Sequence, residues 1–138
     1  MKKAKKLLSK VLIATPTMDG KLEAYYVDSL LNTLVLGAAK GYDIKHLFVG
    51  YDSLLPRAAI DNDFDELLFI DADMVWNPEW VIQLLETGLD YVGGTARKKN
   101  DDTYDFAMKI TPDLLNQKFL KDQKDILEVE VVGTGFLK

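Results

Sequence analysis

A chain of 138 residues fits one domain with a real hydrophobic core and is too short for two independent cores. Apolar residues make up 48% and charged residues 28%, which is typical of a soluble globular protein. The net charge of -5 argues against nucleic acid or anionic lipid as a partner, because phosphate groups there are bound by clustered Lys and Arg. Cysteine is absent, which excludes disulfides and thiolate chemistry, and no apolar run reaches the length of a membrane span or signal peptide. We therefore expect a cytoplasmic protein.

Strand and helix patterns alternate over the first 94 residues. Strands are predicted at 10–15, 43–50, 66–71 and 89–94, helices at 21–40 and 77–88, a short helix or turn at 54–62, and later strands at 105–110 and 126–132. Such alternation implies right-handed crossovers and a single α/β domain over residues 1–138, with a mostly parallel sheet flanked by helices. Ligands of such sheets bind at the carboxyl ends of the strands.

Local signals support the main elements. Gly41 stands where a helix C-terminal glycine belongs, and Asn77 followed by Pro78 is a strong helix start. The segment ELLFID places four apolar residues between acidic ones, which predicts a strand in the middle of the sheet. His46, the only histidine, shares a strand face with Ile44 and Phe48, so we predict a structural role for it.

The segment FIDADM carries the most specific chemistry. On an extended chain Asp71 and Asp73 point the same way while Ala72 turns aside, so two carboxylates converge at a strand end. Their repulsion is relieved by a hard divalent cation, Mn²⁺ or Mg²⁺, which prefers oxygen ligands and bridges to diphosphate oxygens. The simpler alternative is a pair of solvated acids that begin a loop. The buried strand before the pair and the capped helix after it favour a site.

Four segments in this order, VLIATPT, LLFIDADMVWNPEWV, VGGTARKK and VVGTGF, resemble the GT-A fold glycosyltransferases, and the resemblance spans almost the whole chain. It implies a family-2-like enzyme that moves a sugar from a UDP- or GDP-sugar to an acceptor hydroxyl. It also implies that Asp73 contacts the metal and that Asp71 lies near the ribose or the metal. The loop with Thr15, Pro16, Thr17 and Asp19 would hold the base and ribose, although a plain turn explains Asp19 as well.

Two basic residues and two tryptophans are weaker candidates. The resemblance places Arg57 near the diphosphate or sugar, and Lys98, after a glycine pair, could meet phosphate. Both can equally be solvated surface residues. Trp76 and Trp80 are predicted to be helix-packing residues rather than a sugar platform, although Trp76 is close enough to DAD to remain a candidate platform.

The alternatives are a binding module of the same fold without turnover, and a haloacid-dehalogenase-like phosphatase. In the phosphatase the aspartate motif opens the domain and continues with small residues, whereas Met74 and Val75 follow here. No general base can be assigned among Asp101, Asp102, Asp105 and Glu130. Because family members continue with acceptor-binding elements, we expect the C-terminal part of the fold to be incomplete and acceptor transfer to be poor.

Overall fold

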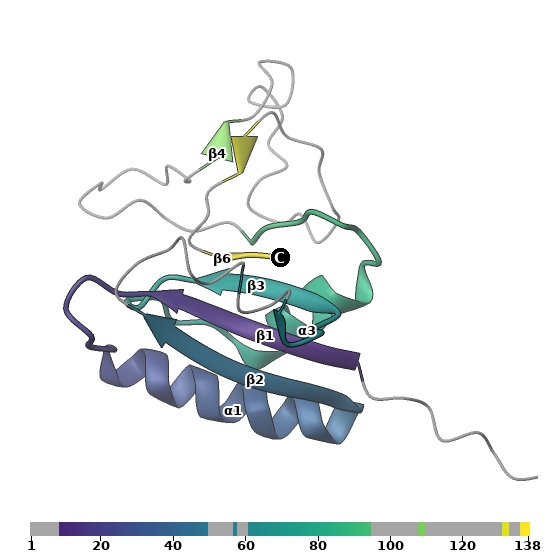
Figure 1. The fold of residues 1–138 in the computed structure, drawn as a ribbon, viewed down its shortest axis with the longest axis horizontal. Helices are drawn as coiled ribbons and strands as arrows, with labels where there is room; N and C mark the ends of the chain where they lie inside the picture. The colour runs from purple at the N-terminus through teal and green to yellow at the C-terminus, as the bar shows by residue number, and fades with distance from the viewer. Residues whose placement is uncertain (1–8, 50–56, 58–60, 95–107, 110–130, 133–135) are drawn as a thin grey trace, which may run out of the picture.

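The computed structural model describes residues 9–49, 57, 61–94, 108–109, 131–132 and 136–138 (Figure 1). Its elements, in chain order, are β1 (Ser9–Pro16), α1 (Ala24–Lys40), β2 (Tyr42–Val49), β3 (Glu66–Ile70), α3 (Pro78–Glu86), β4 (Met108–Lys109), β5 (Val131–Val132) and β6 (Phe136–Leu137). No helix among these described residues is long and apolar enough to cross a membrane.

Four strands form the main sheet in the order β2-β1-β3-β6. β1 pairs in parallel with both β2 and β3, and β6 pairs antiparallel with β3. The predicted α/β class and mostly parallel sheet are confirmed, and β3 lies between two other strands as its apolar run predicts. A separate pair, β4 and β5, is antiparallel.

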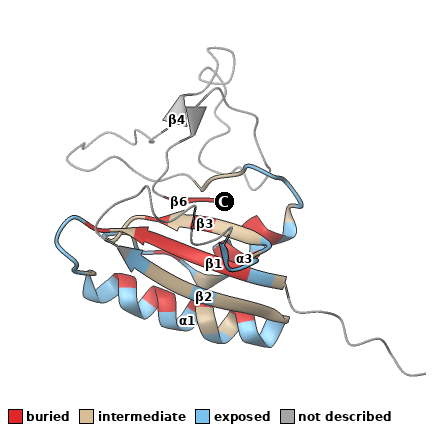
Figure 2. Ribbon diagram, in the orientation of Figure 1, coloured by how far each residue is buried: buried red, intermediate tan, exposed pale blue. Residues whose placement is uncertain are grey.

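The helices α1 and α3 cover one face of the sheet. Because side chains alternate along a strand, Val11 and Ile13 of β1 point to the same side as Leu68 and Ile70 of β3. All four are fully buried and pack with residues of both helices. Figure 2 shows the buried segments concentrated in β1, β3 and the inner sides of the helices.

The start of α1 differs slightly from the prediction. The helix begins at Ala24 rather than at residue 21, and the Glu23 backbone, still extended, turns into it. It ends as predicted, with Gly41 in the left-handed region at φ 89° and its N–H bonded to the Ala38 carbonyl oxygen at 3.2 Å.

The predicted start of α3 is confirmed. The Asn77 side chain accepts a hydrogen bond from the Glu79 backbone N–H at 3.0 Å, and Pro78 occupies the first turn, where a missing N–H costs nothing. The helix ends at Glu86, and Gly88 follows with a positive φ of 67°.

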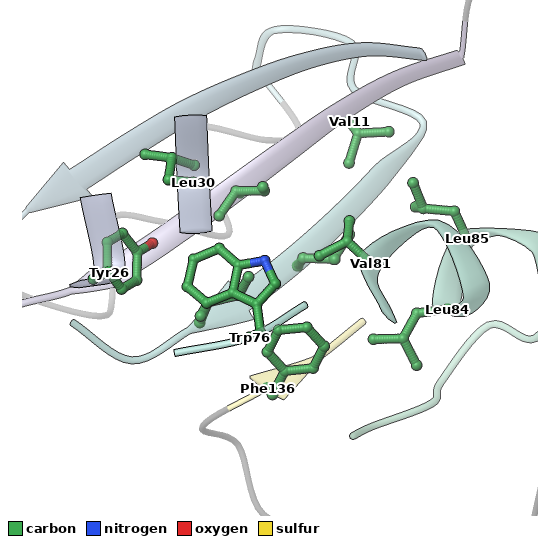
Figure 3. Packing of buried hydrophobic residues seen from close by; sticks show 11 residues of the cluster. Val11, Tyr26, Leu30, Trp76, Val81, Leu84, Leu85 and Phe136 are labelled. Atoms are coloured by element: carbon green, nitrogen blue, oxygen red, sulfur yellow. The ribbon is translucent and has the colours of Figure 1, made fainter. Parts of the chain in front are cut away.

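Trp76 lies at the centre of the core between α1, α3 and β6 (Figure 3). Its ring meets Tyr26 edge-on with centroids 4.9 Å apart and lies 5.9 Å from the Phe136 ring. Its indole N–H donates to the Thr33 hydroxyl at 2.9 Å, which satisfies the only polar group of the buried ring.

The prediction of a full strand at 89–94 is wrong. Only residues 92–94 pair. Val92 exchanges two backbone hydrogen bonds with Lys138, the Gly94 N–H donates to the Phe136 carbonyl oxygen at 2.8 Å, and Gly93 forms an isolated antiparallel bridge with Leu137. Asp90 and Tyr91 bend away and are exposed, so an apolar run alone did not make a strand there. Of the strands predicted at 105–110 and 126–132, β4 and β5 are described, and the remainder lies outside the described residues, as does most of 54–62.

Candidate functional site

The loops after β1 and β3 meet at the carboxyl edge of the sheet. The two strands are parallel neighbours with Ala14 opposite Phe69, so the residues that follow each strand leave the sheet side by side. One hydrogen bond joins the loops: the Glu23 backbone N–H donates to the Ala72 carbonyl oxygen at 3.2 Å. The structure therefore brings the predicted nucleoside loop and the DAD segment to one place.

The loop after β1 is held by its own side chains. The buried Thr17 hydroxyl shares its one proton between the Lys21 carbonyl oxygen at 3.1 Å and the Asp19 carboxylate at 3.4 Å. The same Asp19 oxygen accepts from the Lys21 backbone N–H at 3.1 Å. Asp19 thus serves the turn, as the simpler explanation predicted, while its carboxylate stays largely in solvent. Pro16 is half-buried at the end of β1.

The backbone at DAD is a turn, not an extended strand. β3 ends at Ile70, and the Met74 N–H donates to the Asp71 carbonyl oxygen at 3.0 Å. The premise that Asp71 and Asp73 point the same way because they alternate along a strand is therefore wrong. Asp71 is half-buried and Asp73 is exposed, so the two residues differ in their environment. Their roles in ligand binding stay predictions.

The carboxylates of Asp71 and Asp73 suit a hard cation whose other ligands are not supplied by the protein. Asp71 and Asp73 offer carboxylate oxygens at one edge, which is the chemistry that Mg²⁺ and Mn²⁺ prefer. Among the described residues no group of three or more Asp, Glu, His or Cys gathers to hold a metal. A cation held here by two carboxylates needs phosphate and water oxygens to complete its coordination, which is how Mg²⁺ is usually bound.

A buried polar cluster lies directly beneath this edge. The Thr15 hydroxyl bonds both to the Tyr26 hydroxyl and, at 2.9 Å, to Nε2 of His46, while the tyrosine oxygen lies 3.3 Å from the same nitrogen. The histidine ring also stacks on Phe48 with centroids 5.9 Å apart. His46 thus makes packing and hydrogen-bond contacts within the protein, and its structural role stays a prediction. The Thr15 side chain is fully buried and hydrogen-bonded inside the protein, so only its backbone remains for a nucleoside.

Burial shifts both titratable members of this cluster. It raises the pKa of the Tyr26 phenol to about 12; the Thr15 hydrogen bond opposes the rise, and the negative charge of Asp71 adds to it. Desolvation lowers the pKa of His46, so the ring is held neutral. Sequence spacing identified Tyr26 as a helix position, but its hydroxyl partners come from strands 11 and 20 residues away.

Trp76 and Trp80, for which the sequence predicted the same packing role, differ in their burial. Trp76 is 4% exposed and packs in the core, which removes its ring as a sugar platform. Trp80 is 51% exposed in the first turn of α3, so its ring is not part of the core. Trp80 directly follows Glu79 and lies on the outer side of a short helix. The pattern of apolar residues in the sequence did not distinguish this exposed position from the buried positions of the helix.

The basic candidates are placed only in part. Arg57 is exposed, and its Nε donates to the Asp61 carboxylate at 3.1 Å, one helical turn away. Its contact with a diphosphate stays a prediction. Lys98 lies outside the described residues. So do all four acids considered as a general base: Asp101, Asp102, Asp105 and Glu130.

The opposite end of β3 borders a hollow of about 420 Å³. Its lining includes three acids, Asp65, Glu66 and Asp90, together with Lys138. The Lys138 ammonium is already paired with Glu66 at 3.2 Å and donates to the Leu89 carbonyl oxygen at 2.9 Å. With its one lysine neutralised, this acidic hollow is unsuited to a diphosphate.

Comparison with protein-family models, with curated proteins and with solved structures finds no match. The assignment of a function therefore depends on the chemistry of the edge where the two loops meet.

Proposed function

We propose that the chain is a metal-dependent glycosyltransferase of GT-A type that binds a nucleoside-diphosphate sugar at the carboxyl edge of β1 and β3. The observation that supports this most is the hydrogen bond between the Glu23 N–H and the Ala72 carbonyl oxygen, which ties the loop after β1 to DAD. Nucleotide sites of open α/β sheets are built from loops at this edge.

The cation is proposed to be held by Asp71 and Asp73, with diphosphate oxygens and water as its remaining ligands. Bound there, it supplies a Lewis acid that neutralises the charge of the departing nucleoside diphosphate. In this proposal the half-buried Asp71 supplies one ligand from the protein side, and the exposed Asp73 supplies the other from the solvent side. The chain's own contribution is to position the cation and the nucleoside loop together.

Local charge makes the cation necessary in this proposal. Asp19, Glu23, Asp71 and Asp73 lie in the two loops against the single Lys21, whose ammonium is 3.5 Å from the Asp19 carboxylate, and the chain carries a net charge of -5. Without a cation, a diphosphate at this edge meets carboxylates and is repelled. Donor binding is therefore expected to depend on metal far more strongly than it would at a basic phosphate site.

The test is a calorimetric and thermal-shift panel of UDP- and GDP-sugars with Mn²⁺ or with chelator. A ligand that binds the native state raises its apparent stability, so the panel identifies both metal dependence and donor. Asp73→Asn should weaken metal-dependent binding by at least about tenfold, since a lost charge-assisted contact is worth about 1.5 kcal/mol or more. The matched control is Asp90→Asn, which removes the same charge from an exposed acid beside the hollow at the other end of β3.

Equal donor affinity with metal and with chelator, or equal effects of Asp73→Asn and Asp90→Asn, contradicts the proposed site. Turnover is measured separately, as release of nucleoside diphosphate with and without a pool of acceptors. Metal-dependent binding with no release under either condition identifies the protein as a binding module of the same fold.

A further inference from the structure

The tip of the loop between β1 and α1 carries an aspartate followed directly by a glycine. Met18, Asp19 and Gly20 are all exposed, and the Asp19 side chain is 60% exposed. Figure 2 shows this exposed loop at one end of the sheet. The sequence contains no other Asp-Gly pair and no Asn-Gly pair, so chemistry that requires such a pair is confined to this loop.

An Asp-Gly pair is chemically labile because the glycine nitrogen can attack the aspartate side chain. The nitrogen forms a bond to the carboxyl carbon Cγ, while its proton and the carboxyl hydroxyl leave together as one water molecule. The product is a five-membered succinimide ring, which water then opens. Addition of water at Cγ restores aspartate, whereas addition at the main-chain carbonyl gives isoaspartate, whose backbone runs through the former side chain. Glycine favours the attack because no β-carbon shields the nitrogen.

The loop places both reacting groups favourably. Oδ1 of Asp19 accepts a hydrogen bond from the Lys21 N–H at 3.1 Å, so the side chain folds back along the chain toward the Gly20–Lys21 peptide. The Gly20 N–H donates no hydrogen bond to the described part of the chain, so no bond there has to break before the nitrogen attacks. Gly20 has φ 72°, and a β-carbon built on it would meet nothing within 4 Å. The surroundings therefore leave room for ring closure.

Asp28 provides the contrast within the same chain. It too is exposed and precedes a small residue, Ser29, but it lies inside α1, where helical hydrogen bonds fix the backbone. Its carbonyl oxygen also accepts from the Asn32 side chain at 3.0 Å. Ring closure at Asp28 requires the helix to open, whereas at Asp19 it requires only a rotation within a loop. Local structure therefore separates the two aspartates.

We propose that Asp19 is a site of spontaneous isomerisation to isoaspartate, through a succinimide formed with the Gly20 nitrogen. The product lengthens the loop backbone by one carbon atom and moves the carboxylate, so Asp19 loses its hydrogen bonds with Thr17 and with the Lys21 N–H. Those bonds hold the loop to which the proposed function assigns the nucleoside. The isomerisation does not depend on that function, whereas its effect on donor binding does.

The test is incubation of the full chain at neutral to slightly acidic pH, followed by tryptic peptide mapping with mass spectrometry. Isoaspartate is measured by methylation with an isoaspartyl methyltransferase, and ring opening by uptake of label from heavy-oxygen water. The rate at Asp19 should lie within about tenfold of the rate in a free peptide of residues 16–22, because exposed loops open at little cost. The rate at Asp28 should be at least about tenfold lower than the rate at Asp19.

Two variants address the two reacting groups separately. Asp19→Glu keeps the carboxylate but would have to close a six-membered ring, and Gly20→Ala keeps the aspartate but shields the nitrogen. Gly20→Ala should lower the rate by at least about tenfold, and Asp19→Glu should remove detectable methylation at this position. Far-UV circular dichroism confirms that each variant is folded.

A folded chain that stays free of isoaspartate while the free peptide converts overturns the proposal. Equal rates at Asp19 and Asp28, or an unchanged rate in Gly20→Ala, overturn it as well. Donor affinity is measured on the same incubated samples. Isoaspartate at Asp19 with unchanged donor affinity supports the modification and contradicts the assignment of the loop to the nucleoside. Absence of donor binding before incubation contradicts the proposed function alone.

Discussion

Replacement of Trp76 by phenylalanine should destabilise the protein strongly, whereas the same change at Trp80 should not. Trp76 is 4% exposed and contacts Tyr26 and Phe136, while Trp80 is 51% exposed. The two substitutions are chemically identical, so any difference between them reports the environment of the ring.

Two losses contribute at Trp76. Its indole N–H donates to the Thr33 hydroxyl at 2.9 Å, and an intramolecular hydrogen bond of this kind is worth about 0.5–1.5 kcal/mol. The Thr33 hydroxyl keeps its own donation to the Ser29 carbonyl oxygen at 2.8 Å, which limits the cost to that range. The smaller ring also leaves a void, and deletion of a few buried carbons costs about 1–3 kcal/mol. The expected loss is about 2–4 kcal/mol at Trp76 and under about 1 kcal/mol at Trp80.

Urea unfolding followed by far-UV circular dichroism measures both variants on one scale, because it does not depend on either tryptophan's fluorescence. If Trp76→Phe and Trp80→Phe lower the free energy of unfolding equally, Trp76 is not the centre of the core. If Trp76→Phe instead leaves stability unchanged and abolishes binding of a sugar donor, the ring is a ligand platform and its buried placement is wrong.

Two further predictions concern a titrating group and a close contact. Burial lowers the pKa of His46 in the folded state, so as the pH falls the unfolded chain takes up a proton first, at about pH 6.5. The free energy of unfolding should therefore be at its full value above that pH and decrease below it. Thermal melts from neutral pH to about pH 5.5 check this, and His46→Gln should flatten the decrease, since no other histidine is present; an unchanged slope in that variant assigns the effect to other groups. Gly94→Ala should cost about 1–3 kcal/mol, because its β-carbon would stand 2.7 Å from the buried Phe136 ring, and a urea midpoint equal to that of the parent protein would show that the ring yields at no cost.

Local sequence signals were sufficient to predict those helices and strands whose ends or cores depend on neighbouring residues. The β-branched run at β1, the Gly41 terminus of α1 and the Asn77–Pro78 start of α3 each depend on residues a few positions apart, and each appears as predicted. Element ends shifted by one to three residues where a partner from elsewhere intervened, as at Glu23, whose N–H is bonded to Ala72 rather than to a helical turn.

The candidate site was predictable in outline and not in geometry. Parallel strands carry their following loops to one edge, so a βαβ pattern was enough to bring the loop after β1 near DAD. The orientation of Asp71 and Asp73 depends instead on the residue at which β3 ends. The pairing of β3 with its neighbours β1 and β6 extends only to Ile70, one residue short of the strand end that the sequence predicted.

The sequence by itself determined the α/β class, the parallel pairing and the identity of the polar residues at the sheet edge, because hydrophobic period, helix caps and chain connectivity are local properties. Only the tertiary structure decided which apolar residues are covered. In the folded protein Trp76 is buried and Trp80 is half-exposed, although both follow the same apolar pattern, and the Thr15 hydroxyl is enclosed with Tyr26 and His46. Burial and hydrogen bonding depend on residues from distant elements, and their positions exist only once the sheet and helices have packed.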